Sequence, residues 1–360
     1  MAPHLNRLIH FHSTQIYFYV HGMADLYAAG GLVAALGIPR KRVLLKKIGR
    51  EIDLKKVRKV LAGFSFTRCS RPPRNAVLVK FDTEGPARLN EDGSVIATYD
   101  PFKYFLPRRR IKKNKSRIRL AMKLAKTRKV IAVSCTTADE VQFVIRACKK
   151  LQRQPRPLLI FAMRRPDPLL AKRISKQEGL RVLDRRSHRE PLSGFGKSDV
   201  VILNTMGELF DLMPVSDLAI VGHDRNIFEP AFLGVPVLYF AQPLNMHPQD
   251  KQLARWFKLF WRKNRTAKFF LDRFGGAAAV KKAFFHRQIE SILLHPRSMS
   301  RGARRAVHAV YREILPVAAC RTGLVMLEAV KRLGKTDCVG RTEYLRSWRT
   351  SCAGHRTLWL

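Results

Sequence analysis

Short hydrophobic runs alternate with helix-patterned stretches through the middle of the chain. The runs predict buried strands at 130–134, 157–162, 181–183, 199–203, 218–221 and 235–240. Helices are predicted between several of them, including 138–151 and 168–178, the second of which ends at Gly179. Apolar strands that alternate with helices indicate a parallel sheet covered on both faces.

A similar pattern opens the chain. Residues 16–20 predict a strand, 26–36 predict a helix that ends at Gly37 and Pro39, and 76–81 predict a second strand. A strand, a glycine-containing turn and a helix are typical of the start of a Rossmann-like unit. After residue 251 the pattern is mostly helical. We therefore predict an α/β protein with two Rossmann-type lobes on parallel sheets, spanning 1–107 and 108–334, followed by a tail at 335–360.

Composition limits the cofactors and the compartment. The chain has 360 residues, 46% of them hydrophobic, enough for two ordinary cores. Its 6 cysteines are scattered without a CxxC pair, which predicts neither a metal site nor a disulfide framework and favours a reducing cytoplasm. No run approaches the roughly 20 apolar residues of a membrane span, and the start lacks the order of a signal peptide.

The charge is extreme, with 69 Lys+Arg against 27 Asp+Glu and a formal net charge of +42. Such a chain attracts polyanions, namely nucleic acid, an anionic membrane or an acidic glycolipid. The stretch 251–274 interleaves aromatic and basic residues, which fits either an interfacial membrane helix or a helix with aromatics in the core. The basic segment 108–129 fits attraction to an anionic leaflet. Nucleic-acid binding is the rival interpretation, although no RNP, KH, zinc-knuckle or helix-turn-helix signature occurs.

Polar residues follow three of the predicted strands. They are Arg164 and Arg165 after 157–162, Thr205 to Glu208 after 199–203, and Asn226 and Glu229 after 218–221. Ligands bind at the carboxyl ends of such sheets. Arginines, a helix start with a glycine and a carboxylate together suit a nucleotide's phosphate and ribose. Each motif taken alone also fits a solvated basic turn or a capped helix start.

Several motifs resemble, in order and spacing, those of the 3-deoxy-D-manno-octulosonic acid (Kdo) transferases. They are Phe102–Pro107, Ser134–Glu140, Met163–Pro166, Asn204–Leu209, Asn226–Ala231, Gly234–Val237 and Asn245. The resemblance covers about residues 101–234. It implies a GT-B-like fold, although the N-terminal lobe is abbreviated between 36 and 102 relative to the family. It also implies CMP-Kdo as donor substrate without a further cofactor, an anionic lipid A-type acceptor, and a place at the cytoplasmic face of the membrane.

The resemblance also implies roles for individual residues. It assigns donor binding to Ser134, Arg164, Arg165, Thr205, Met206, Gly207, Glu208, Asn226, Glu229 and Asn245. The stretch Gly22–Ala29 is similar to the motif that holds the family's catalytic glutamate, which places Asp25 as general base, unless Asp25 only caps its helix. Three features depart from the family: Asp25 replaces a glutamate, Arg165 replaces a histidine, and the loop before Asn226 is shorter. A non-catalytic relative, or a basic protein that binds nucleic acid or another polyanion, is the alternative.

Overall fold

The computed structural model divides the chain into two α/β units. It describes residues 15–20, 23–36, 38, 43–47, 76–82, 86–98, 115–134, 138–152, 155–162, 168–185, 192–203, 209, 212–222, 227–241 and 268–333, with the backbone alone at some positions, including 23–27. The first unit comprises Met1–Leu106 and Ala309–Leu360, and the second comprises Pro107–His308.

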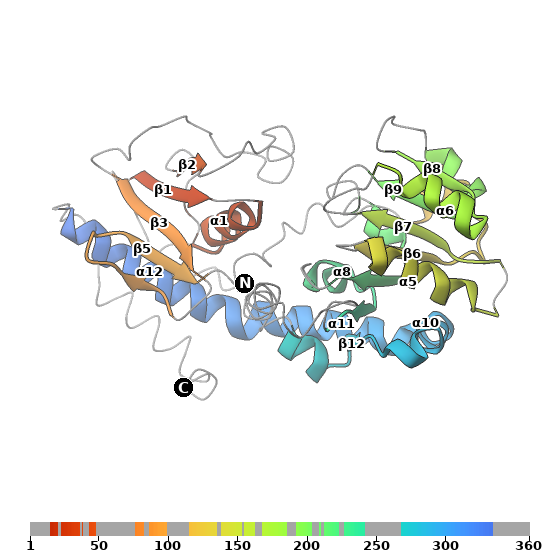
Figure 1. Ribbon diagram of the computed structural model, residues 1–360. Coiled ribbons are helices and arrows are strands. Elements are labelled where there is room, and N and C mark those ends of the chain that lie inside the picture. Colours follow the sequence, from red (N-terminus) through yellow and green to blue (C-terminus); the bar gives the residue numbers. More distant parts are fainter. Residues whose placement is uncertain are drawn as a thin grey trace, which may run out of the picture. The chain divides into compact units, whose positions relative to one another are not determined.

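The first unit contains a five-stranded sheet of order β2-β1-β3-β5-β4 (Figure 1). Its elements are β1 (Gln15–Val20), α1 (Met23–Leu36), β2 (Val43–Lys47), β3 (Ala76–Asp82), β4 (Arg88–Leu89), β5 (Val95–Thr98), the π-helical turn η7 (Val310–Ile314) and α12 (Leu315–Arg332). The strands pair in parallel except β4, which is antiparallel to β5. The strands predicted at 16–20 and 76–81 and the helix predicted at 26–36 correspond to β1, β3 and α1, whereas β2, β4 and β5 were not predicted.

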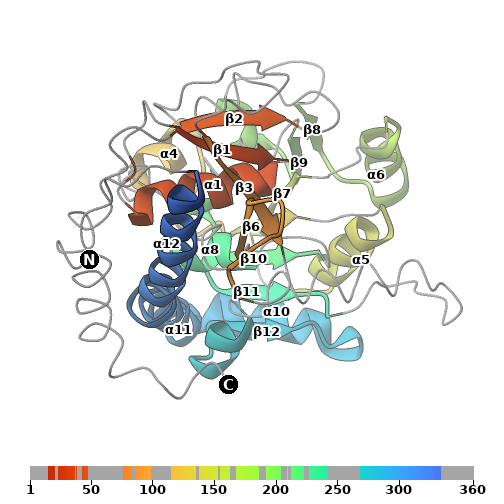
Figure 2. The same ribbon diagram turned by 90° about the vertical axis from the view of Figure 1, so that its left-hand side faces the viewer.

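The C-terminal helix α12 belongs to the first unit. Its buried residues, among them Leu315, Ala319 and Met326, join the core formed by α1 and the sheet. Figure 2 shows α12 beside α1, and the helix also contacts β3, β4 and β5. From the sequence, residues 108–334 were all predicted to belong to the second lobe. Hydrophobic periodicity shows that a helix has a buried face but not which core covers that face.

The second unit contains a seven-stranded, fully parallel sheet of order β12-β11-β10-β6-β7-β9-β8. The strands are β6 (Val130–Ser134), β7 (Leu158–Ala162), β8 (Val182–Asp184), β9 (Val200–Leu203), β10 (Leu218–Val221), β11 (Val237–Tyr239) and β12 (Ala277–Ala279). The α-helices are α4 (Lys115–Ala121), α5 (Ala138–Lys149), α6 (Leu170–Glu178), α8 (Phe228–Phe232), α10 (Phe285–Leu294) and α11 (Pro296–Ala309). The 3₁₀ turns are η4 (Leu192–Lys197), η5 (Met213–Val215) and η6 (Lys282–Phe284).

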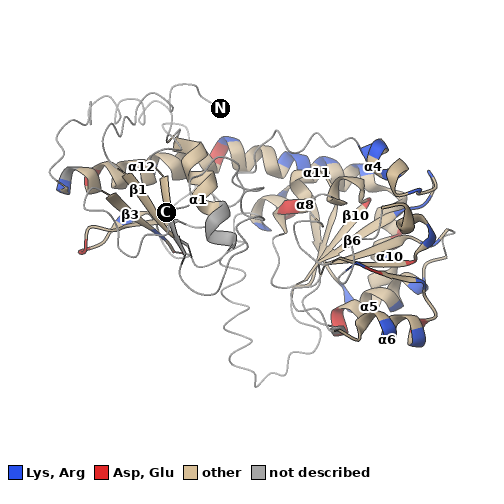
Figure 3. Cartoon of the chain, turned by 90° about the horizontal axis from the view of Figure 1, so that it is seen from above, with Lys and Arg blue, Asp and Glu red and all other residues tan. Residues whose placement is uncertain are grey.

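Helices cover both faces of this sheet, as the continuous apolar runs predicted. Figure 3 shows α5, α6 and α10 on one side and α4, α8 and α11 on the other. The central strands β6, β7, β9 and β10 are buried throughout. Gly179 ends α6 as expected, because it takes the left-handed conformation (φ 63°) and donates its N–H to the Ser175 carbonyl at 3.0 Å.

The prediction of two Rossmann-type lobes on largely parallel sheets is therefore confirmed. The unpredicted strand β12 consists of three alanines, which favour helix in isolation. Pairing with β11 makes this segment a strand, so tertiary context overrides its local preference. The predicted tail at 335–360 lies outside the described residues.

Candidate functional site

The strand order of the second unit creates a topological switch point at one edge of its sheet. From β6 the chain builds β7, β8 and β9 on one side, and it then adds β10, β11 and β12 on the other side of β6. The connections that leave β6 and β10 therefore depart in opposite directions along the sheet. At such a switch point the carboxyl ends of two adjacent parallel strands leave room for a ligand.

Ser134 occupies this switch point. It is the last residue of β6, pairs in register with Val221 of β10, and its carbonyl accepts the Gly222 N–H at 2.6 Å. Its side chain is buried, and its hydroxyl has no hydrogen-bond partner in the described part of the chain. A buried hydroxyl without a partner is unfavourable by about 1–3 kcal/mol. A ligand that hydrogen-bonds to this hydroxyl would remove that cost.

Glu229 lies on the other side of the switch point. It is in the first turn of α8, which follows β10, and its side chain is half-buried. Because β6 and β10 are parallel neighbours, Ser134 and Glu229 belong to the same edge of the sheet. These are the two predicted donor-binding residues whose side chains the structure describes.

The other predicted donor-binding residues lie outside the described residues, but the strands before them are described. Arg164 and Arg165 come directly after β7, Thr205 to Glu208 after β9, Asn226 just before α8, and Asn245 after β11. The strands β10, β6, β7 and β9 are consecutive neighbours in one parallel sheet. The motifs therefore follow strands that all end at one edge.

The predicted general base lies in the first unit. Asp25 is in the first turn of α1, directly after β1, and its side chain is not described. It therefore follows the carboxyl end of a strand in a largely parallel sheet, as the motif predicted.

Glu140 is a buried carboxylate that the sequence analysis did not select as a site residue. It lies in the first turn of α5, the helix that follows Ser134, and it is fully buried. The sequence Thr137-Ala-Asp-Glu140 has the form of a capping box, in which the glutamate accepts a backbone N–H at the helix start. The capping-box pattern could have identified Glu140 from the sequence. It favours a structural role, in which Glu140 stabilises the start of α5, the helix that follows Ser134.

Tyr239 and Lys268 form a second polar group at the carboxyl edge. The Tyr239 hydroxyl donates to Asp272 at 3.3 Å, and Lys268 pairs with the same carboxylate. Burial, followed by the charge of Asp272, raises the pKa of Tyr239, and the hydrogen bond to Asp272 raises the pKa of Lys268. These contacts tie the helical segment at 268–273 to the end of β11. The prediction that this part of 251–274 is helical is confirmed, whereas 251–267 lies outside the described residues.

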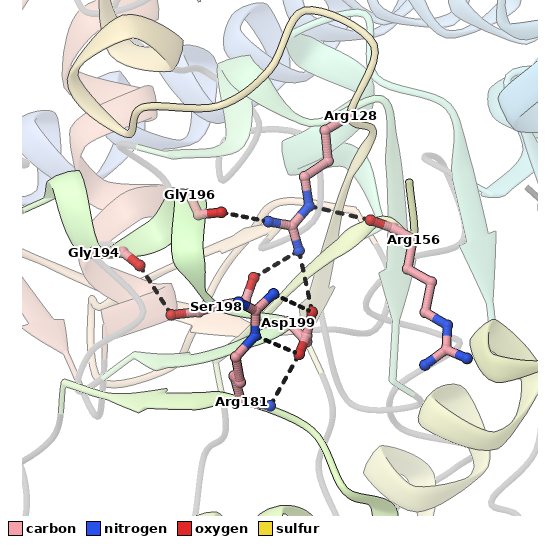
Figure 4. Close-up of polar contacts among 7 residues, drawn as sticks. All are labelled: Arg128, Arg156, Arg181, Gly194, Gly196, Ser198 and Asp199. Atoms are coloured by element: carbon pink, nitrogen blue, oxygen red, sulfur yellow. Dashed lines mark hydrogen bonds and ion pairs between the residues drawn. The ribbon is translucent and has the colours of Figure 1, made fainter. Parts of the chain in front are cut away.

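A different charged cluster joins the opposite, amino-terminal edge of the sheet (Figure 4). Arg128, just before β6, donates to the carbonyls of Arg156 at 3.1 Å, Gly196 at 2.8 Å and Ser198 at 2.6 Å. Its guanidinium also lies 3.6 Å from Asp199, which receives hydrogen bonds from Arg181. These groups precede β6, β7, β8 and β9, so the cluster fixes the starts of four strands.

Electrostatics at this edge is consistent with a structural role. Burial lowers the pKa of Arg128, while the nearby Asp199 opposes that effect. Burial by itself raises the pKa of Asp199, but the hydrogen bonds and charge of Arg181, together with the charge of Arg128, lower it below its ordinary value. Because the Arg128 donors are used on backbone carbonyls, this cluster is not a candidate for ligand binding.

Neither a metal-ligand cluster nor a membrane-spanning helix occurs among the described residues. Among the described residues, no group of three or more His, Cys, Asp or Glu side chains could hold a metal ion. Within the same part of the chain, no helix is long and apolar enough to cross a membrane.

Comparison with known proteins gives matches among solved structures alone, since no protein-family model and no curated protein matches this sequence. The C-terminal CMP-Kdo binding domain of WaaA from Acinetobacter baumannii is 20% identical, over 57% of this chain and 98% of that domain, with a TM-score of 0.41. The UDP-GlcNAc 2-epimerase from Neisseria meningitidis bound to UDP-GlcNAc is 8% identical, over 89% of this chain and 100% of the epimerase, with a TM-score of 0.48. WaaG, a glycosyltransferase involved in lipopolysaccharide biosynthesis, is 10% identical, over 86% of this chain and 98% of WaaG, with a TM-score of 0.42. The fold assignment rests on the strand order and pairing described above.

Proposed function

We propose that this protein is a glycosyltransferase of the GT-B type. It would transfer Kdo or a related acidic sugar from a CMP-activated donor to a lipid A-type acceptor at the cytoplasmic face of the membrane. The observation that carries the proposal is that the Kdo-transferase-like motifs all follow strands that end at the same edge of one parallel sheet. They follow β6, β7, β9 and β10, around a switch point that holds the buried Ser134 hydroxyl.

The donor would be held through its negative charges and its ribose. Arg164 and Arg165 would bind the phosphate or the sugar carboxylate, because guanidinium groups form paired hydrogen bonds with such anions. The backbone N–H groups of Gly207 and Glu208 would add to the anion site. Asn226 and Glu229 would hold the ribose, and Ser134, Thr205, Met206 and Asn245 would complete the donor site.

The reaction would be a displacement at the anomeric carbon of the sugar. Asp25 would accept the proton of the acceptor hydroxyl while that oxygen bonds to the anomeric carbon. The bond between the anomeric carbon and the phosphate oxygen breaks, and CMP leaves with the electron pair. The arginines would stabilise the negative charge on the departing phosphate, and no metal ion is required.

Calorimetry with CMP, UMP and GDP on the full chain tests the donor assignment, and we expect CMP to bind most tightly. Turnover of CMP-Kdo on a lipid A precursor tests the chemistry. Asp25→Asn should abolish turnover while CMP affinity stays within about threefold, because the base acts on the acceptor rather than on the nucleotide. Asp25→Glu, which restores the residue of the resembling family, should keep turnover.

Full activity of Asp25→Asn would exclude Asp25 as the general base. Tighter binding of UMP or GDP than of CMP would exclude a CMP-activated sugar as the donor. The alternative function is a non-catalytic relative that binds nucleotide or another polyanion. The replacement of glutamate by aspartate at position 25 and the net charge of +42 favour that alternative. Its signature would be CMP binding without turnover in both the native protein and Asp25→Glu.

A further inference from the structure

The helix α11 of the second unit carries a one-sided array of positive charge. Its exposed basic residues, called here the basic stripe, are Arg297, Arg301, Arg304, Arg305 and His308. They occur at i, i+4, i+7, i+8 and i+11, positions that share one side of an α-helix. The opposite side is buried and consists mainly of small residues, Gly302, Ala303, Ala306 and Ala309.

The charges of the basic stripe are not neutralised within the described part of the chain. No residue of the stripe makes a hydrogen bond or ion pair there, and α11 contains no acidic residue. Other cations of the same unit behave differently, since Arg128, Lys149 and Lys268 each contact a carboxylate. Figure 3 shows the Lys and Arg positions in blue along α11. Like charges four residues apart repel one another, so this arrangement is unfavourable for the helix unless an anion covers it.

We propose that the basic stripe docks the protein on an anionic phospholipid surface. At about 1.5 Å per residue, the stripe extends roughly 17 Å along a straight line, so a flat layer of headgroups can contact all of it at once. Arginine forms paired hydrogen bonds with phosphate and is less strongly hydrated than lysine. The aliphatic part of the Arg304 side chain packs against Gly234. A Cβ added to Gly234 would lie 3.3 Å from the Arg304 Cγ atom, so the glycine leaves room for this packing.

The composition of α11 favours a lipid surface over nucleic acid. Proteins that bind single strands stack bases on aromatic side chains, and readers of duplex bases use asparagine and glutamine beside arginine. The helix α11 contains no Phe, Tyr, Trp, Asn or Gln, and His308 is its one aromatic side chain.

The test is co-sedimentation of the full-length protein with vesicles of phosphatidylcholine alone or of phosphatidylglycerol and phosphatidylcholine at roughly 3:7, because an anionic surface attracts basic segments. We compare the native protein with the variant Arg297→Gln, Arg301→Gln, Arg304→Gln, Arg305→Gln. The matched control, Lys126→Gln, Lys150→Gln, Lys172→Gln, Lys176→Gln, removes the same charge from exposed positions elsewhere on the second unit. The double variant Arg301→Gln, Arg305→Gln decides the question if the fourfold variant does not fold.

Each arginine near an anionic surface contributes a factor of about five, so four of them contribute up to about 600-fold, and the stripe variant should bind anionic vesicles at least about 50-fold more weakly. The lysine control should lose less than about fivefold, and raising the salt should weaken native binding steeply. Equal losses in the two variants, or no binding by the native protein, would overturn the proposal. Stripe-dependent binding to poly(U) RNA with unchanged vesicle binding would overturn it in favour of nucleic acid. Vesicle binding needs neither donor nor turnover, so this proposal and the proposed function fail separately.

Discussion

At the scale of single residues, two buried serines with unsatisfied hydroxyls allow the proposed donor site to be tested, because one of them lies at that site and the other does not. Ser134 ends β6 at the carboxyl edge of the sheet, and Ser216 precedes β10 at the amino edge. Both are buried, and neither hydroxyl has a hydrogen-bond partner in the described part of the chain. The two residues share the same chemistry and differ in which edge of the sheet they occupy.

We predict that Ser134→Ala and Ser216→Ala each raise the free energy of unfolding of the free protein by about 1 kcal/mol, because each removes an unsatisfied buried hydroxyl. Ser134→Ala alone should weaken CMP binding, by about fivefold, the size of one hydrogen bond. Urea unfolding and calorimetry measure the two quantities. Unchanged CMP affinity in Ser134→Ala would exclude its hydroxyl from the donor site.

At the scale of elements, close packing decides the effect of a glycine within α11. Gly302 lies inside this helix, where alanine is intrinsically favoured over glycine by about 1 kcal/mol. An added Cβ would lie 2.2 Å from the Phe274 carbonyl oxygen and 2.7 Å from the Gly275 carbonyl carbon, both of them backbone atoms. The helix therefore approaches the turn before β12 more closely than any side chain allows.

We predict that Gly302→Ala lowers the free energy of unfolding by about 2 kcal/mol, opposite in sign to the helix preference, because the backbone must shift to make room. Gly194→Ala is the matched control, since its added Cβ meets only the Leu183 side chain, at 3.3 Å. Urea unfolding of both variants measures the difference. A Gly302→Ala protein as stable as the control would show that α11 can move away from this turn at little cost.

The polar links between strand starts also act at this scale. Asp217, before β10, accepts the Val130 N–H at 2.9 Å and lies 3.7 Å from Arg119, so it fixes the start of β10 to that of β6. Arg128 and Asp199 do the same for β6 and β9. These links hold the amino ends of the strands, and the proposed donor site lies at the opposite, carboxyl edge, where binding residues commonly lie in loops positioned by a fixed scaffold.

At the scale of the whole molecule, the net charge of +42 makes acid an effective denaturant, because each carboxylate that is protonated adds to the self-repulsion. Asp199 adds a specific contribution. Its pKa is lower in the folded protein than its ordinary value, so the unfolded chain binds that proton more tightly. Its stabilisation is full above the unfolded pKa, about 3.9, and it is lost as the pH falls through the lower folded pKa.

We predict that the thermal midpoint of the native protein falls between about pH 5 and pH 3, and that Asp199→Asn is less stable at pH 7 but loses less over this interval. Glu290→Gln is the control, because Glu290 has no ion pair among the described residues. Circular dichroism melts at each pH measure both effects. Parallel curves for the native protein and Asp199→Asn would show that this carboxylate does not couple folding to protons.

Much of the fold and part of the candidate site follow from local pattern. Apolar runs such as 130–134 and 218–221 coincide with β6 and β10, because a strand buried on both faces needs apolar residues throughout. Glycines such as Gly179 end helices for a backbone reason that is visible in the sequence. The motifs after these strands could be located for the same reason, since ligand loops follow strand ends.

Pairings between distant segments could not be predicted in this way. The sequence determined that the chain is α/β, that it is strongly basic, and that arginine, glycine and polar residues follow successive strands. The tertiary structure alone decided that β10 pairs with β6, which makes Ser134 part of a switch point, and that α12 joins the first core. It also left the charges of α11 uncovered within the described residues. Hydrophobic periodicity indicates which face of a helix or strand is buried. Which element packs against that face depends on contacts between residues far apart in the chain.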